Sequence, residues 1–122
     1  MTDVFFFDSY ALFEIVKGNP SYEPYLNTRL LITKLNLFEL YYGLLRTLGE
    51  QDADIWVEKY KEFVIDFDIS DVKAAAQLRL AFKSEDLSMT DCIGYVLAKK
   101  WGVPFLTGDV KFEKKPNVNY IK

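Results

Sequence analysis

The sequence contains no histidine and only one cysteine, Cys92. An intrachain disulfide and a zinc site built from several thiolates are therefore excluded. Catalytic mechanisms that use a histidine base, such as Ser–His–Asp and Cys–His arrangements, are excluded as well. If the protein is an enzyme, its chemistry must come from carboxylates, hydroxyls or lysines. Sites built from carboxylates alone favour hard cations such as Mg²⁺ or Mn²⁺.

Long apolar runs are also missing from the sequence. None approaches the ~20 residues that a membrane-spanning helix needs. The apolar run Val4–Phe7 is too short for the core of a signal peptide, and no basic segment precedes it. We therefore expect a cytoplasmic protein without a membrane partner. With 122 residues, half of them hydrophobic, the chain is long enough to form a single domain, residues 1–122, around one substantial core.

The net charge of −3 is unevenly distributed along the chain. Residues 99–122 carry six lysines against Asp109 and Glu113, a net of +4, so residues 1–98 carry −7. A basic C-terminal segment beside an acidic site would suit a polyanionic substrate. Ordinary solvated lysines would give the same distribution, so charge alone does not decide between the two.

Apolar runs that are typical of buried strands alternate with amphipathic segments that are typical of helices. This alternation predicts right-handed crossovers and a mainly parallel sheet, with the aromatic run Val4–Phe7 as its central strand. Further strands are expected at Leu30–Thr33, Val64–Phe67, Val103–Leu106 and Val118–Ile121, and helices at Tyr10–Lys17, Asn36–Leu48, Gln51–Phe63, Asp71–Lys83 and Cys92–Trp101.

Four acids stand where these expected elements begin or end. Asp8 directly follows the first strand, and Glu39 lies among apolar residues on the helix after the second strand. Asp91 lies at the head of the last long helix, and Asp109 follows the strand after it. Because the carboxyl ends of parallel strands meet at one edge of a sheet, we expect these acids to gather there.

Local structure offers another explanation for three of these acids. Asp8 can cap the first helix, and both Asn36-x-x-Glu39 and Ser88-x-x-Asp91 match the capping-box spacing. However, four carboxylates that converge without a basic partner repel one another, and proteins keep such groups where a divalent cation neutralises them. The spacing therefore leaves a structural and a functional interpretation open for each acid.

The ordered set Asp8…Glu39…Asp91…Thr107-x-Asp109 resembles the PIN-domain ribonucleases, and more narrowly the VapC-type toxins of toxin–antitoxin pairs. The resemblance spans nearly the whole chain. It implies an α/β fold, a three-layer α/β/α sandwich with a mainly parallel central sheet of four to five strands. It further implies a Mg²⁺- or Mn²⁺-dependent endoribonuclease in which the four acids hold the metal and Thr107 orients a carboxylate or a water.

Partners follow from the same resemblance. Relatives of this size are usually homodimers that a small antitoxin protein holds inactive, and their substrate is RNA. Few arginines lie near the expected site, so lysines would have to bind the RNA backbone. The candidate substrate contacts are Ser9, Lys111, Lys114 and Lys115.

Two other function classes remain open at this point. A signalling receiver domain would use Asp68, Thr107 and Lys115-Pro116, but the acid pair that it needs after the first strand is missing, since Asp8 follows Phe7 and precedes Ser9. A catalytically idle PIN-like RNA-binding module would keep the fold without the chemistry. The presence of all four acids favours the enzyme.

Overall fold

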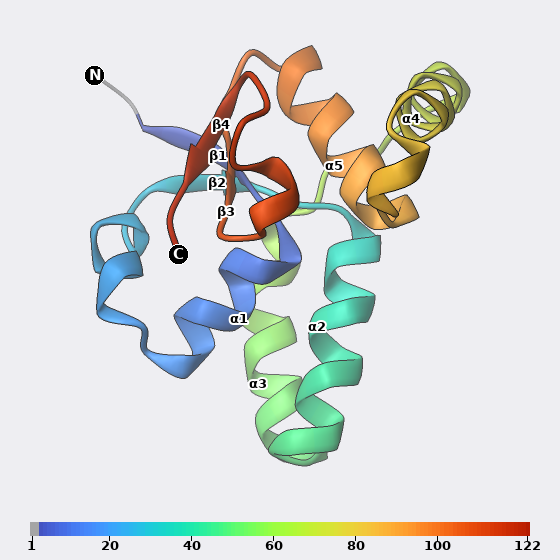
Figure 1. The fold of residues 1–122 in the computed structure, drawn as a ribbon. Coiled ribbons are helices and arrows are strands. Elements are labelled where there is room, and N and C mark those ends of the chain that lie inside the picture. The colour runs from blue at the N-terminus through green and yellow to red at the C-terminus, as the bar shows by residue number, and fades with distance from the viewer. Residues whose placement is uncertain (1–2) are drawn as a thin grey trace.

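Residues 3–122 are described by a computed structural model, in which four strands form one parallel sheet (Figure 1). The strand order is β2-β1-β3-β4, so β1 lies in the interior between β2 and β3. The predicted three-layer α/β/α fold with a parallel sheet of four to five strands is confirmed. The strands are β1 (Val4–Phe7), β2 (Arg29–Leu31), β3 (Phe105–Thr107) and β4 (Val118–Tyr120).

Helices cover both faces of this sheet (Figure 1). On one side α1, α2 and α3 surround one hydrophobic core, and on the other side α4 and α5 pack against each other and against the sheet. The α-helices are α1 (Ser9–Lys17), α2 (Lys34–Thr47), α3 (Glu50–Tyr60), α4 (Ile69–Ala81) and α5 (Met89–Lys100), and the 3₁₀ turns are η1 (Pro20–Tyr25), η2 (Lys61–Phe63), η3 (Lys83–Glu85) and η4 (Val110–Phe112). No helix within residues 3–122 is long and apolar enough to span a bilayer.

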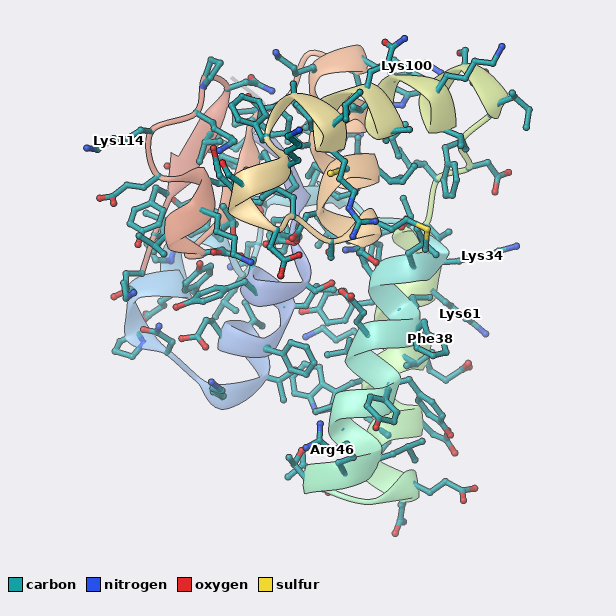
Figure 2. The ribbon with its side chains drawn as sticks, turned by 45° about the vertical axis from the view of Figure 1, so that its right-hand side comes forward. Lys34, Phe38, Arg46, Lys61, Lys100 and Lys114 are labelled. Carbon is teal, nitrogen blue, oxygen red and sulfur yellow. The ribbon has the colours of Figure 1, made fainter. Side chains whose placement is uncertain are left out.

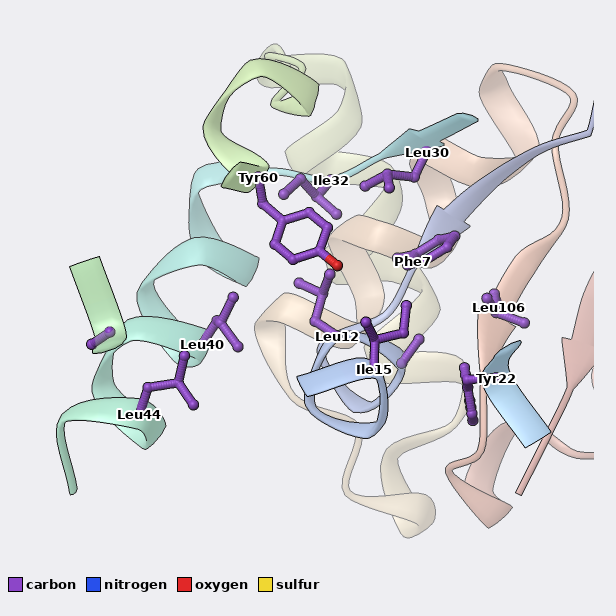
Figure 3. Packing of buried hydrophobic residues seen from close by; sticks show 12 residues of the cluster. Phe7, Leu12, Ile15, Tyr22, Leu30, Ile32, Leu40, Leu44, Tyr60 and Leu106 are labelled. Carbon is purple, nitrogen blue, oxygen red and sulfur yellow. The ribbon is translucent and has the colours of Figure 1, made fainter. Parts of the chain in front are cut away.

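The unbroken apolar run of β1 is explained by burial on both faces. Successive strand residues point to opposite sides, so Phe6 enters the core beneath α5 while Phe7 enters the core beneath α1. Figure 3 shows the second of these environments, where Phe7 and Leu106 of the sheet approach Leu12 of α1. A strand exposed on one face would instead alternate apolar and polar residues.

The predicted strand at Val64–Phe67 is wrong. This segment makes a single parallel bridge, between Ile32 and Val64, at the outer side of β2. The pairing stops after this bridge because the partner segment turns away: β2 ends at Leu31, and Thr33 already caps α2.

Two helix starts also differ from the expected ones. Thr33, not Asn36, is the N-cap of α2, and its capping box closes with Asn36 at the third helical position, so the expected box Asn36-x-x-Glu39 is wrong. Likewise Asp68 caps α4, which begins at Ile69 and not at the expected Asp71. In both cases the first polar residue after the extended segment takes the cap, because its side chain can accept from an amide one turn ahead. The box of Ser88 and Asp91 on α5 is confirmed.

Helix α5 approaches the sheet closely at Gly94. A Cβ at this position would lie 2.7 Å from the Cε1 atom of Phe6 and 3.2 Å from that of Phe105. Both rings are fully buried and stack on each other, so they have little room to move aside.

We therefore expect Gly94→Val to lower the free energy of unfolding by about 2 kcal/mol, the usual cost of overpacking a tight core. Urea denaturation measures this change. Ala81→Val, at the exposed C-terminal end of α4, is the control and should cost less than about 0.7 kcal/mol. An equal loss in both variants would show that the α5–sheet contact is not tight.

Candidate active site

The site begins where β1 and β3 end side by side. Their parallel register pairs Phe7 with Leu106, which brings the next residues, Asp8 and Thr107, together. The Thr107 hydroxyl donates to Asp8 Oδ2 at 2.7 Å, and the Ser9 amide donates to Asp8 Oδ1 at 2.9 Å. Asp8 is 3% exposed and Thr107 is fully buried. The carboxylate is therefore held by both of its oxygens while it also serves as the N-cap of α1.

Thr107 connects this carboxylate to Asp109. Its hydroxyl oxygen accepts from the Asp109 amide at 3.0 Å, so its single proton is directed to Asp8. Asp109 in turn caps η4, where its Oδ1 accepts from the Lys111 amide at 3.0 Å. Thr107 thus fixes the positions of two acids that follow neighbouring strands.

Asp91 reaches this region from α5. Its Oδ2 accepts from the Ser88 amide and its own amide donates to the Ser88 hydroxyl, both at 3.0 Å. The structural interpretation of this acid is correct. It does not exclude the functional one, because among residues 3–122 the cap engages a single carboxylate oxygen.

Glu39 is joined to the site through Ser9. The Ser9 hydroxyl donates to Glu39 Oε1 at 2.6 Å and accepts from Asn36 Nδ2 at 3.0 Å. The Ser9 hydroxyl, predicted to contact the substrate, is thus already hydrogen-bonded to two side chains of α2. The substrate contact stays a prediction. Asn36 was missed as a site residue, although its place one helical turn before Glu39 puts both on one face of α2.

The acids influence one another electrostatically. Burial is the main cause that raises the pKa of Asp8 from 3.8 to about 7; the charges of Asp91 and Asp109 add to the rise, and the hydrogen bonds from Thr107 and Ser9 oppose it. Burial is also the main cause that raises the pKa of Asp91, to which Asp109 adds. The hydrogen bonds of Ser88 and the charge of Lys111 act in the opposite direction. Asp8, Asp91 and Asp109 therefore form one interacting group of charges.

The donor set fits a hard divalent cation. Carboxylate and hydroxyl oxygens are the ligands that Mg²⁺ and Mn²⁺ prefer, and a cation would favour the charged form of Asp8, whose pKa is raised by burial and by the charges of Asp91 and Asp109. Among residues 3–122, no three acidic or cysteine side chains already stand close enough to form a finished metal cage. Asp8, Asp91 and Asp109 are the residues that could hold the ion, with Glu39 joined to them by Ser9.

The three candidate lysines differ in their surroundings. The Lys111 ammonium donates to the Asp86 carbonyl at 3.1 Å, and its charge acts on Asp91. Lys114 extends outward from the C-terminal segment (Figure 2).

Lys115, the third of these lysines, is engaged in contacts within the protein. Its ammonium pairs with Glu85, donates to the Lys111 carbonyl at 2.8 Å and lies over the rings of Phe82 and Phe112. Its side chain is only 9% exposed. The sequence alone could not show that Glu85 of η3 would form an ion pair with the Lys115 ammonium.

Comparison with known proteins agrees with this geometry. A family model described as the PIN domain matches residues 5–118. Among solved structures, a toxin–antitoxin complex from Klebsiella pneumoniae is similar at 19% identity, with 93% of this chain and 94% of that chain covered and a TM-score of 0.74.

Two further structures are similar over nearly the full length of both chains. One is VapBC2 from Rickettsia felis bound to a DNA fragment from its promoter, at 19% identity, with 98% and 99% coverage and a TM-score of 0.73. The other is DNA-bound VapBC from Salmonella typhimurium, at 23% identity, with 98% and 97% coverage and a TM-score of 0.73. No curated protein matched the sequence.

The raised pKa of Asp8 makes stability depend on pH in the absence of metal. Between the ordinary pKa of 3.8 and about 7, the folded protein binds a proton that the unfolded chain has released, so the free energy of unfolding should fall as pH rises. The loss should be on the order of 4 kcal/mol and complete above pH 7. Asp8→Asn, which keeps the helix cap, should flatten this slope. Urea denaturation in EDTA at several pH values measures it.

The matched control is Asp66→Asn, which removes an exposed carboxylate and should keep the wild-type slope. A wild-type protein whose stability stays constant or rises between pH 4 and pH 7 would contradict the electrostatic description of Asp8.

Proposed function

The chain belongs to the PIN-domain family, and from that premise we propose that its 122 residues form a single PIN domain that acts as a Mg²⁺- or Mn²⁺-dependent endoribonuclease. The observation that carries the proposal is the buried Asp8 carboxylate, which shares Thr107 with Asp109 and whose pKa is raised by burial and by the charges of Asp91 and Asp109. A folded protein gains nothing in stability from such a repulsive group, so a cation-dependent function explains its presence better than a structural one.

Each residue of the site has a distinct part in the proposed reaction. Asp8, Asp91 and Asp109 bind the cation, and Thr107 keeps the carboxylates of Asp8 and Asp109 in place. When bound, the divalent cation neutralises the acids, supplies positive charge to the scissile phosphodiester and makes water more acidic.

Glu39 is joined to the same edge through Ser9, and its carboxylate is the fourth ligand of the cation, directly or through a water. Lys111 adds positive charge close to Asp91, where the RNA backbone would approach. Lys114 is exposed and available for the same backbone farther out.

We further propose that the protein is the toxin of a toxin–antitoxin pair, that it binds a small antitoxin protein and that it forms a homodimer. The support is that structures described as toxin–antitoxin and VapBC complexes are similar over more than nine-tenths of this chain. The cytoplasmic location stays a prediction.

The catalytically idle module is the remaining alternative, and the four acids count against it. The receiver-domain alternative is wrong, because the chain is a PIN domain. Asp68, its candidate phosphoacceptor, is the N-cap of α4, where its Oδ1 accepts from the Asp71 amide.

Purified protein should cleave structured RNA in the presence of Mn²⁺ and not in EDTA. Asp91→Asn should reduce cleavage by about 100-fold or more, the loss that follows removal of one charge-stabilising group. The variant should remain as stable as the wild type without metal, or become more stable, because the amide oxygen can still accept from the Ser88 amide while the charge is removed. Gel analysis of a mixed RNA pool and urea denaturation measure the two effects.

Asp66→Asn is again the control and should cleave like the wild type. A wild-type protein that neither cleaves the pool nor gains melting temperature with Mn²⁺ would support the idle module, because a ligand that binds only the native state must raise the melting temperature. A strongly destabilised Asp91→Asn would show that the acid serves the helix cap alone.

A further inference from the structure

Asn36 is a buried amide in the first turn of α2, only 1% exposed, and its side chain joins the cap residue Thr33 to Ser9 of the candidate site. We propose that Asn36 is a positioning residue that fixes the carboxylate of Glu39 through the hydroxyl of Ser9. This inference rests on the proposed metal-dependent function, because it assigns the residues that orient one acid of that site.

The orientation of the Asn36 amide is determined by its neighbours. The Thr33 amide donates to Asn36 Oδ1 at 2.9 Å, and the Thr33 hydroxyl donates to the same oxygen at 3.0 Å. If the amide were turned around, its NH₂ group would face the Thr33 backbone amide, which can only donate, and this buried hydrogen bond would be lost. The oxygen therefore faces Thr33, and the nitrogen faces Ser9.

This orientation gives the whole chain of hydrogen bonds a direction. Asn36 Nδ2 can only donate, so the Ser9 oxygen accepts from it at 3.0 Å. The hydroxyl of Ser9 has one proton, and that proton is then directed to Glu39 Oε1 at 2.6 Å. One oxygen of Glu39 is thereby held by the protein, which leaves the other oxygen to face a ligand.

Ser9 also connects Glu39 to the first acid of the site. Its backbone amide donates to Asp8 Oδ1 at 2.9 Å while its side chain donates to Glu39, so one residue contacts acids from β1 and from α2. Without this link, Glu39 would depend only on its own flexible side chain to reach the edge of the sheet. The hydrogen bonds from Asn36 to Ser9 and from Ser9 to Glu39, here called the relay, thus fix the position of Glu39 relative to Asp8.

The capping role of Asn36 and its positioning role use different atoms. The cap uses Oδ1, and the relay uses Nδ2. The relay can therefore be broken at Ser9 while the cap of α2 stays intact, which separates the inference from a purely structural role.

The test is the affinity of the purified protein for Mn²⁺, measured by isothermal titration calorimetry without RNA. Ser9→Ala should weaken Mn²⁺ binding about tenfold, the lower end of the usual effect of losing a partner that orients a metal ligand. Ser9→Thr retains the hydroxyl and should stay within about twofold of the wild type. Asn36→Leu should weaken binding by the same factor as Ser9→Ala.

A double-mutant cycle shows whether Ser9 acts through Glu39. In a Glu39→Gln background, Ser9→Ala should cause little further loss of Mn²⁺ affinity, because the group that it orients is already changed. If Ser9→Ala does not fold, Ser9→Cys carries the same expectation, since a thiol is only a weak donor. Asp68→Ala, which loses the cap of α4 instead, should lower the melting temperature and leave Mn²⁺ affinity unchanged.

The possible results are distinguishable. If the wild type binds Mn²⁺ and Ser9→Ala binds it equally well, or if the effects of Ser9→Ala and Glu39→Gln add, the relay is refuted while the proposed function stands. If the wild type does not bind Mn²⁺, the proposed function fails and the relay fails with it.

Discussion

The burial of one carboxylate at the end of the central strand is the constraint on which the rest of the structure depends. Asp8 follows an apolar strand that is covered by helices on both faces, so its side chain has almost no access to water. Burial and the nearby acids Asp91 and Asp109 both disfavour its charge, while among residues 3–122 only Thr107 and Ser9 donate to it. An isolated buried charge of this kind is costly, and a bound cation, as proposed, would offset that cost.

The same hydrogen bonds start the helices and orient the acids. Asp8 caps α1, Asp91 closes the capping box of α5, and Asp109 caps η4. A structural role does not exclude a functional one for these residues. In each cap one carboxylate oxygen accepts from a backbone amide, and this bond fixes the position of the other oxygen. Glu39 differs from them. It takes no part in a cap, and it depends on Ser9 and Asn36 for its position.

The fold and the acids were predictable because they follow from periodicity and strand ends. Val4–Phe7 could only be a strand buried on both faces, and this places Asp8 at the edge of the sheet. Contacts between residues far apart in the sequence could not be predicted. One example is the ion pair of Lys115 with Glu85, which are 30 positions apart, and another is the hydrogen bond from Asn36 to Ser9, which are 27 positions apart. Caps were mistaken by a few residues, as at Thr33 and Asp68, because several neighbouring polar residues could each have capped the helix.

The most direct test of the account is a crystal structure of the protein soaked in Mn²⁺, with the anomalous signal of the metal recorded. The account predicts an anomalous peak at the ends of β1 and β3, within coordination distance of Asp8, Asp91 and Asp109. A crystal in which Mn²⁺ binds elsewhere, or in which these carboxylates remain without a metal at saturating Mn²⁺, would contradict it.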